Sequence, residues 1–290
     1  MSRETSLSHA VTSPVRVAFQ GEPGAYSEEA AYQALGEAIQ TLPRPRFEDV
    51  FEAVAQGEAD LGVLPIENSL AGSIHRNYDL LLRYEVHIVG EYHYRVRHCL
   101  LALPGVRLED LEEVRSHPQA LAQCEGTLNR LGLRPVVAAD TAGSARWVAQ
   151  TQARHVAALA SRRAAQVYGL HILMEGLEDN PQNYTRFLLV AREPHTVPLR
   201  QGQDYKTSVV FTLPNKPGSL FKALSVFALR DIDLTKIESR PIPGRPWEYL
   251  FYVDFLGHAE HGPGERALAH LREIAPFLRV LGSYPRHPFQ

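Results

Sequence analysis

The sequence predicts an α/β protein with two lobes, followed by a smaller α+β unit at its C-terminal end. Strands and helices alternate across residues 15–191, which is typical of parallel-rich sheets with helices on their faces. Two apolar strands in this part meet charged and amide side chains abruptly, at residues 65–69 and 183–187. The stretch after residue 204 has the order βαββαβ, which gives an antiparallel sheet with two helices on one face.

Size and composition allow substantial cores and exclude two classes of partner. With 290 residues, 44% of them hydrophobic, the chain has the length of about two domains. Its formal charge of −3 at pH 7 comes from interleaved acids and bases. We therefore expect no nucleic acid and no membrane as a partner. Residues 1–14 are polar and lack an apolar segment, so we expect a disordered tail and a cytoplasmic protein.

Neither the cysteines nor the histidines have the spacing of metal ligands. Cys99 and Cys124 are isolated, and in a reducing compartment we expect both to be buried thiols without chemistry. The thirteen histidines form no HxH or HxxxH pair within a helix-like segment. The sequence thus indicates no metal and no cofactor.

The first part of the chain is a series of strand, turn and helix units. Residues 15–19 predict a strand, and a turn with Gly21 and Gly24 leads to a helix over 28–35 that Ser27 would cap. The long extended run 86–103 predicts a strand or crossover that the two lobes share. Further strands are expected over 61–64, 135–138, 155–161 and 187–191, and further helices over 47–58 and 77–84 and after residues 117, 140 and 161.

The two strand ends that carry charged and amide side chains predict a ligand cleft, because open α/β sheets bind ligands where strands end and loops begin. A second interpretation stays open for residues 183–187: Asn183 and Thr185 would cap a turn, and Arg186 would pair with a surface acid. Ser116 is likewise either a helix cap before Pro118 or a ligand contact.

The C-terminal unit follows a polar stretch at residues 197–204 that we interpret as a linker. Its predicted strands cover 207–212, 233–239, 249–255 and 279–284, and its predicted helices cover 217–230 and 265–277. The turn at 213–220 exposes the N–H groups of a helix start, which suits a carboxylate.

Taken together and in order, these motifs resemble those of the prephenate dehydratase family. The resemblance rests on the stretches PIENS with Gly72, SHPQAL with Gln123, Thr141 with Ala142, 168–170 and NYTRF, and on 218–220 and 238–241 for the family's ACT domain. It covers nearly all of residues 15–285. Ser219 stands where alanine is common in the family.

The resemblance implies a catalytic domain over 15–196, similar to type II periplasmic binding proteins, with its active site between the lobes. Lobe 1 would take about 15–92 and 180–196, and lobe 2 about 93–179. Residues 197–204 would link it to an ACT regulatory domain over 205–290. The implied reaction removes water and carbon dioxide from prephenate to give phenylpyruvate. The short N-terminal tail leaves no room for a mutase or dehydrogenase segment, so we expect a monofunctional form, and we expect a homodimer or homotetramer.

The resemblance also implies roles for individual residues. The expected catalytic residues are Thr185, Glu67 and Asn68. The expected substrate-binding residues are Ser69, Ser116, Gln123, Thr141, Ala142, Arg186 and Phe187. The expected phenylalanine-binding residues, at a subunit interface, are Asn215, Pro217, Gly218, Ser219, Leu220, Glu238 and Ser239.

Chemical reasoning refines these roles. Thr185 would donate to the C4 hydroxyl as it leaves, with Glu67 as a relay if burial raises its pKa. Arg186 would bind the pyruvyl carboxylate or form a structural pair, because a strong cation at the ring carboxylate would oppose decarboxylation. Three rivals remain: an arogenate dehydratase, a solute-binding protein and a non-catalytic amino-acid sensor.

Overall fold

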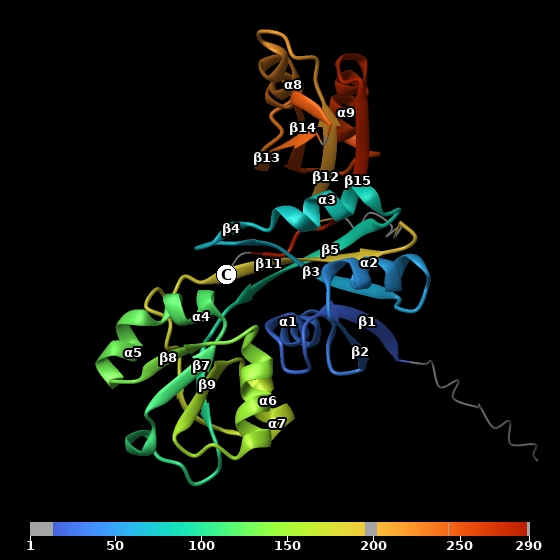
Figure 1. The fold of residues 1–290 in the computed structure, drawn as a ribbon. Coiled ribbons are helices and arrows are strands. Elements are labelled where there is room, and N and C mark those ends of the chain that lie inside the picture. The colour runs from blue at the N-terminus through green and yellow to red at the C-terminus, as the bar shows by residue number, and fades with distance from the viewer. Residues whose placement is uncertain (1–13, 195–201, 243, 289–290) are drawn as a thin grey trace, which may run out of the picture.

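The computed structural model describes residues 14–194, 202–242 and 244–288, which form three sheets with helices packed around them (Figure 1). The first sheet, lobe 1, has the strand order β2-β1-β3-β11-β5, and β4 pairs with β3. Strands β1, β2 and β3 are parallel, whereas β11 runs antiparallel to both of its neighbours. Its elements are β1 (Val15–Gln20), α1 (Tyr26–Leu35), β2 (Ile39–Arg44), α2 (Phe47–Ala55), β3 (Leu61–Asn68), β4 (Gly72–Ser73), α3 (His75–Arg83), β5 (His87–Arg95) and β11 (Tyr184–Ala191).

The second sheet, lobe 2, has the order β10-β6-β9-β7-β8. The chain enters it after β5 and leaves it before β11, so the predicted run 86–103 supplies one strand to each lobe. Its elements are β6 (Cys99–Ala102), the 3-10 helix Leu108–Asp110, β7 (Glu113–Ser116), α4 (Pro118–Gln123), α5 (Glu125–Leu131), β8 (Arg134–Val137), α6 (Thr141–Thr151), β9 (Val156–Ala160), α7 (Arg162–Tyr168) and β10 (His171–Glu175).

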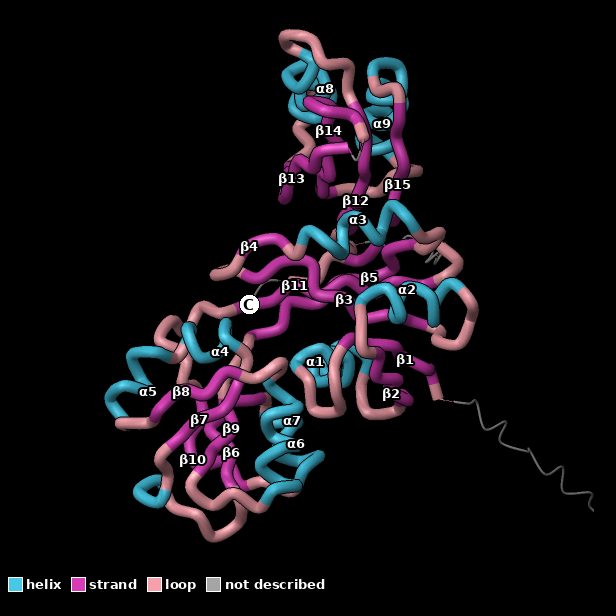
Figure 2. The backbone as a smooth tube through the Cα atoms, viewed as in Figure 1, coloured by secondary structure: helices cyan, strands magenta, loops and turns pink. Residues whose placement is uncertain are grey.

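The third sheet belongs to the C-terminal unit and is antiparallel throughout, in the order β13-β14-β12-β15 (Figure 2). Its elements are β12 (Tyr205–Thr212), α8 (Ser219–Ala228), β13 (Leu234–Ile242), β14 (Arg245–Leu256), α9 (Gly262–Ile274) and β15 (Phe277–Pro285). The predicted order βαββαβ and the predicted two-lobed α/β part are both confirmed.

The lobe 1 sheet is covered differently on its two faces. On one face Val17, Val63 and Phe187 pack with Ala30 and Ala31 of α1. On the other face, Ala18, Leu64 and Leu188 pack in one continuous core with residues of α2, of α3 and of the C-terminal sheet. The C-terminal unit therefore packs directly against this second face, the back of the lobe 1 sheet, next to α3, as Figure 1 shows.

Three strands were not predicted, β2, β4 and β10, and each pairs with a single other strand of the described chain. Strand β2 contains Pro43, which cannot donate to a ladder and is tolerated because β2 has only one neighbour, β1. Strand β10 is the edge strand of lobe 2 and is interrupted by a register shift between Ile172 and Met174. Edge strands lack the continuous apolar run by which buried strands are recognised.

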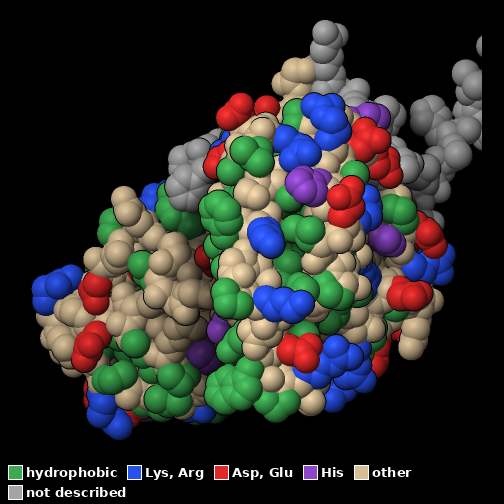
Figure 3. Space-filling view, turned by 90° about the horizontal axis from the view of Figure 1, so that it is seen from above, with side chains coloured by type: hydrophobic (Ala, Val, Ile, Leu, Met, Phe, Trp, Pro, Cys, Tyr) green, Lys and Arg blue, Asp and Glu red, His purple; other side chains and the backbone are tan. Residues whose placement is uncertain are grey.

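The distribution of surface charge and the burial of the cysteines are as the sequence predicts. Acidic and basic side chains are interspersed over the face seen from the C-terminal unit (Figure 3). Cys99 and Cys124 are free and buried, as predicted, and burial raises the pKa of the Cys99 thiol to about 12. Among the described helices, none is long and apolar enough to cross a membrane.

Candidate active site

A cleft of 280 Å³ lies between the two lobes, close to the lower end of the usual range for small-molecule sites. Lobe 1 and the connecting strands supply most of its wall, and lobe 2 supplies the ends of two helices. Its lining residues are Gln20, Gly21, Ala25, Tyr26, Ser27, Pro65, Asn68, Ile74, Val96, His98, His117, Gln119, Ala120, Gln123, Asp140, Thr141, Thr185 and Phe187.

Thr185 and Asn68 form a cross-strand pair on the cleft face of the lobe 1 sheet. The Asn68 side-chain oxygen accepts hydrogen bonds from the backbone N–H groups of Leu70 and Ala71, at 3.0 and 2.9 Å. These contacts fix the orientation of its amide, so Nδ2 faces Thr185 and donates to Oγ1 at 3.0 Å. Because the Thr185 oxygen accepts this bond, its own proton is available to another acceptor.

A chain of side-chain hydrogen bonds continues from this pair across the cleft. Asn68 also donates to Asn183 Oδ1 at 2.8 Å, and Asn183 Nδ2 donates to Gln123 Oε1 at 3.0 Å. The same Gln123 oxygen lies 2.9 Å from His98 Nε2, and His98 Nδ1 lies 2.6 Å from the Tyr26 hydroxyl. Since the Gln123 oxygen can only accept, Nε2 carries the proton and the Tyr26 hydroxyl donates to Nδ1. Burial lowers the pKa of His98, which favours this neutral form.

Two helices begin at the wall of the cleft. Among the described residues that line it there is no lysine or arginine. Helices α1 and α6 both begin at its wall, with Tyr26 and Thr141 as their first residues. Unpaired N–H groups at a helix start, with the helix dipole, attract carboxylates. Asp140 already caps α6, whereas α1 has no side-chain cap, so the start of α1 can bind an anion without a strong cation beside it.

Glu67 does not line this cleft, although its neighbours Asn68 and Pro65 do. In the pairing of β3 with β11, Arg186 stands opposite Glu67 and Phe187 opposite Pro65, so Ile66 is an extra residue in β3. Such a bulge re-aims the next side chain. Glu67 consequently points to the back of the sheet, where its carboxylate accepts a bond from Lys236 Nζ at 2.9 Å. The expected relay from Glu67 to Thr185 has no hydrogen-bonded path in this arrangement.

Arg186 also points to the back of the sheet. Its guanidinium lies 2.8 Å from Glu91 and 2.5 Å from Asp254, and it donates to the Tyr284 hydroxyl at 3.0 Å. Burial opposes ionisation of Asp254, but Arg186 and Ser208 outweigh it and lower the Asp254 pKa. Of the two roles considered for Arg186, these contacts support the structural pair, and they correct the expectation of substrate binding.

Three further expected contact residues, Ser69, Ser116 and Ala142, do not line the cleft. Ser69 Oγ donates to Gln182 O at 2.7 Å and so joins β3 to the segment before β11. Ser116 is fully buried, and its Oγ donates to Leu159 O at 2.6 Å. Ala142 is buried in α6. The expected residues that do line the cleft are Asn68, Gln123, Thr141, Thr185 and Phe187.

His98 and Tyr26 line the cleft and Asn183 lies buried behind it, and none of the three was predicted as a site residue. Asn183 was recognised as part of its motif, but its contact with Gln123 depends on how the lobes meet. His98 lies in the extended connection between β5 and β6, where no periodicity marks a functional residue. The pair Tyr26 and His98 joins positions 72 apart in sequence, and no local pattern predicts it.

A larger cavity, of 610 Å³, opens on the other side of the connecting strands. Arg95 and Arg97 line this larger cavity, whereas Val96 and His98 of the same extended segment line the cleft. Because side chains alternate along an extended segment, the two cavities lie on its opposite faces. Of the expected motif residues, only Tyr184 lines it. The smaller cleft, with the Asn68 and Thr185 pair, is therefore our candidate active site.

The residues expected to bind an effector fall into two groups. Asn215, Ser219 and Leu220 line a small cavity of 130 Å³ together with Trp247 and Tyr249. Pro217 and Gly218 belong to the same turn, and Ser239 lies on β13. Glu238 points toward lobe 1 instead, where Ser73 Oγ donates to its carboxylate at 2.5 Å.

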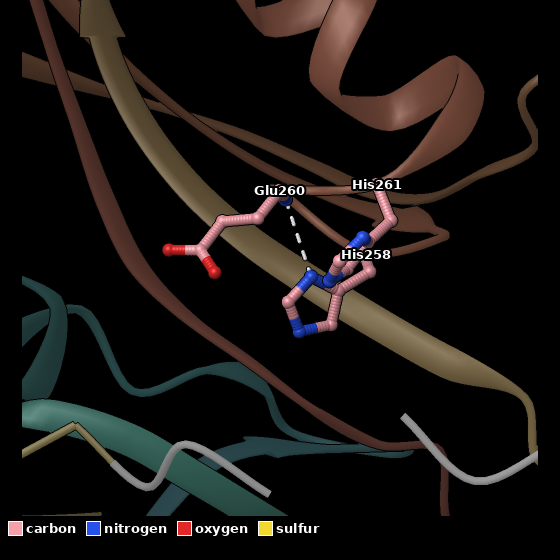
Figure 4. Close-up of side chains that lie close together, drawn as sticks. All are labelled: His258, Glu260 and His261. Atoms are coloured by element: carbon pink, nitrogen blue, oxygen red, sulfur yellow. Dashed lines mark hydrogen bonds between the residues drawn. The ribbon is translucent and has the colours of Figure 1, made fainter. Parts of the chain in front are cut away.

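Outside the cleft, His258, Glu260 and His261 lie close together in the loop between β14 and α9 (Figure 4). Their candidate ligand atoms all lie within 4.8 Å of one another. Two imidazoles and a carboxylate suit zinc, but bonds of about 2.0–2.1 Å in a tetrahedral site require ligand atoms only about 3.4 Å apart. His258 Nδ1 already accepts the Glu260 N–H at 3.2 Å. We assign no metal to this cluster.

The fold defines a two-lobed α/β domain with a small cleft between its lobes, joined to a βαββαβ unit. Comparison with known proteins agrees with this class. The family model described as Prephenate dehydratase matches residues 17–195, and the one described as ACT domain matches residues 207–269. The chain therefore belongs to the prephenate dehydratase family, whose members are lyases of aromatic amino-acid biosynthesis.

Individual relatives cover nearly the whole chain. The protein is 54% identical to arogenate dehydratase/prephenate dehydratase 2, chloroplastic, of Arabidopsis thaliana, over 94% of this chain and 73% of that protein. It is 53% identical to arogenate dehydratase 2 of Petunia hybrida, over 94% and 72%.

Two solved structures are similar over almost their full length. The prephenate dehydratase of Arthrobacter aurescens in complex with L-Phe has a TM-score of 0.85 and 37% identity, over 94% of this chain and 90% of that chain. A protein described as GqqA, a novel type of quorum quenching acylase, has a TM-score of 0.88 and 40% identity, over 94% and 98%.

Proposed function

We propose that this protein catalyses the decarboxylative dehydration of prephenate to phenylpyruvate, with Thr185 as the residue that assists departure of the C4 hydroxyl. The observation that carries the proposal is the direction of the bond between Asn68 Nδ2 and Thr185 Oγ1. It occupies a lone pair of the threonine oxygen and leaves the hydroxyl proton to point at a substrate oxygen. Hydroxide is a poor leaving group, so a donor at this oxygen lowers the barrier as negative charge develops.

The absence of a cationic side chain among the described lining residues suits the second half of the reaction. The ring carboxylate leaves as carbon dioxide, and its electron pair enters the ring as the C4–oxygen bond breaks. A lysine or arginine at this carboxylate would stabilise the ground state more than the transition state. The N–H groups at the start of α1, which has no side-chain cap, would bind a carboxylate more weakly, while aromatisation of the ring drives the reaction.

Arogenate is the second candidate substrate, because one relative is named as a dehydratase of both compounds and another as a dehydratase of arogenate alone. Arogenate carries an ammonium where prephenate has a keto oxygen. Asp140 contributes the single carboxylate among the described lining residues, and it would pair with such an ammonium. Its Oδ1 also accepts the Gly143 N–H at 2.5 Å, as the cap of α6.

An acylase reaction, as described for the structural relative, has less support from the cleft. Acyl transfer needs a nucleophile beside a base. His98 is bonded to Tyr26 and Gln123, and His117 Nδ1 accepts the Gln119 N–H at 3.2 Å. Neither histidine activates Thr185 in this arrangement.

We propose that phenylalanine binds the ACT domain at the cavity beside Asn215 and Leu220 and inhibits the enzyme. At 130 Å³ the cavity is below the usual size of a ligand site, so a second subunit would complete it. The surface around it is apolar and exposed, which suits self-association. The exposed apolar side chains that line it are Leu220, Trp247 and Tyr249. Inhibition further requires that phenylalanine prefer the less active arrangement of the lobes.

The test is product formation by the purified protein with prephenate and, in parallel, with arogenate, each with and without phenylalanine. Phenylpyruvate is read by its absorbance in base and phenylalanine by chromatography. We expect phenylpyruvate from prephenate, at a rate that added phenylalanine reduces. A higher kcat/KM with arogenate would replace the proposed substrate. Folded protein that turns over neither compound would overturn the proposal, and hydrolysis of an N-acyl homoserine lactone would then favour the acylase.

A further inference from the structure

The two catalytic strands carry a second, charged pair on the face that points away from the cleft. Thr185 and Asn68 are register partners on the cleft face, and Arg186 and Glu67 are register partners directly beside them. Both members of the second pair bond to the ACT domain: Glu67 to Lys236, and Arg186 to Asp254. The residue next to each proposed catalytic residue is thus held by the regulatory domain.

Lys236, on β13, is the central residue of one of these contacts. Its Nζ lies 2.9 Å from Glu67 Oε2 and 3.3 Å from Ser73 Oγ, and its side chain is only 9% exposed. The ammonium also lies 5.6 Å from the centre of the Tyr78 ring, on α3. Three elements of lobe 1, β3, β4 and α3, therefore meet at a single lysine of the ACT domain.

The β3–β4 hairpin that Lys236 holds also positions the catalytic amide. Glu67 pairs with Ser73 across this hairpin, and Asn68 pairs with Gly72. The Asn68 side chain closes the turn by accepting two backbone N–H groups, and Ile74, directly after β4, lines the cleft. A shift of the hairpin would move Asn68 relative to Thr185, and displacements of about 1 Å at a reacting group can lower a rate about 100-fold.

The contact is continued along β13 by alternate residues. Lys236, Glu238 and Arg240 stand two apart on one face of the strand and give a row of positive, negative and positive charge. Glu238 contacts Ser73 and lies 3.3 Å from His75 Nε2, and Arg240 pairs with Asp79 at 2.7 Å. A slip of β13 along lobe 1 would bring like charges together, so this row fixes the register of the two domains.

We propose that Lys236 is a positioning residue for the dehydratase reaction: it holds Glu67 and Ser73, and thereby fixes the hairpin that presents Asn68 to Thr185. This inference rests on the proposed function. Glu67 has the same positioning role, because the Glu67 carboxylate bonds to Lys236 and does not line the cleft. It also gives the ACT domain a structural route to the active site, through β13.

The test uses the full-length protein with Lys236→Met, which keeps the length and the apolar stem but removes the ammonium. We expect kcat to fall about 10- to 100-fold with KM changed less than about threefold, because substrate groups are not touched. Lys236→Arg should restore part of kcat. The matched control is Lys222→Met, at an exposed lysine of α8, which should keep the wild-type kcat.

A double-mutant cycle on kcat distinguishes a Glu67 that positions the hairpin together with Lys236 from a Glu67 that takes part in catalysis directly. If Lys236 acts through Glu67, then Glu67→Met and Lys236→Met should each cause a similar loss, and the double variant should lose no more than either. Losses that multiply in the double variant, or a Lys236→Met kcat within twofold of wild type, would overturn the inference.

A structural readout keeps this inference separate from the proposed function. Hydrogen exchange of residues 66–74 should be faster in Lys236→Met than in wild type and unchanged in Lys222→Met. If exchange is faster in Lys236→Met but the wild-type protein turns over neither prephenate nor arogenate, the structural role of Lys236 stands and only the proposed function is refuted. Unchanged exchange in an active enzyme would refute the positioning role.

Discussion

At the scale of single residues, the candidate site depends on hydrogen bonds whose direction is fixed by neighbouring backbone groups. Asn68 is a donor toward Thr185 because its oxygen is occupied by the N–H groups of Leu70 and Ala71. His98 keeps its proton on Nε2 because the oxygen of Gln123 can only accept. The polar strand ends predicted a cleft and the family resemblance predicted Asn68 and Thr185, but neither predicted these directions, which depend on contacts between distant segments.

Replacement of Thr185 tests its role as donor. Thr185→Ala should lower kcat about 100-fold or more, because the departing hydroxide then lacks its hydrogen bond, whereas KM should change little. Thr185→Ser keeps the hydroxyl and should retain much of the activity. Steady-state kinetics with prephenate measure both. A Thr185→Ala enzyme with near-normal kcat would refute the assignment.

The pH dependence of stability tests the neutral form of His98. Its folded pKa is lowered by burial below the unfolded value of about 6.5, so below pH 6.5 the unfolded chain binds more protons than the folded one. Stability should therefore fall as pH falls from 6.5, by at most about 1.4 kcal/mol per pH unit for this group. Thermal unfolding of His98→Gln should show a shallower decline than wild type.

The control for this measurement is His155→Gln, at an exposed histidine, which should keep the wild-type slope. Other histidines, such as the half-buried His93, whose pKa burial lowers to about 4, contribute equally to all three proteins. Identical slopes for wild type and His98→Gln would show that His98 does not bind its proton differently in the folded state.

At the scale of elements, the strand and helix order could be predicted, and local irregularities could not. Strict alternation along β3 places Glu67 on the same face as Val63 and Pro65, which is the cleft face. The extra residue Ile66 reverses this for Glu67; Pro65 inside a central strand is a signal for a bulge, but it does not tell which residue is the extra one. The two faces of the β3 and β11 pair therefore had to be observed.

The turn between β1 and α1 is the element that holds the lobes together beside the cleft. Ser161 Oγ donates to Gly24 O at 2.6 Å, and the Tyr168 hydroxyl donates to Pro23 O at 2.8 Å. Gly24 has φ +89°, and a Cβ atom there would lie 2.7 Å from the Ala164 Cα of α7. Only glycine combines this backbone conformation with so close an approach.

Gly24→Ala should therefore push the turn away from α7 and widen the cleft, whose wall includes the next residue, Ala25. We expect a clear rise in KM together with a loss of about 1–3 kcal/mol of stability, from overpacking and backbone strain. Kinetics and thermal unfolding measure these effects. Gly36→Ala is the control, since Gly36 has φ +84° but nothing within 4 Å of its added Cβ. Equal KM values for the two variants would contradict this role of Gly24.

At the scale of the whole molecule, the ACT domain is joined to lobe 1 by buried charge and by a very close backbone contact. Arg186 and Glu91 from lobe 1 meet Lys206 and Asp254 from the ACT domain, two positive and two negative groups. Burying these groups is tolerable because they balance and hydrogen-bond one another, whereas removal of one partner would leave an uncompensated charge. The sequence predicted both domains, but this interface joins residues from four strands and has no local signature.

The close backbone contact gives the sharpest test of this interface. A Cβ atom on Gly282, in β15, would lie 2.0 Å from the backbone oxygen of Ile88 in β5, which cannot move without displacing its strand. Gly282→Ala should thus separate the two sheets at this point and cost about 1–3 kcal/mol, which lowers Tm by several degrees. Because β5 pairs with β11 and so neighbours Thr185, kcat should fall as well. Gly90→Ala is the matched control on β5, where the added Cβ meets the flexible Leu189 Cδ1 at 3.0 Å. A Gly282→Ala protein with the Tm and kcat of Gly90→Ala would show that this contact neither holds the domains together nor supports the active site.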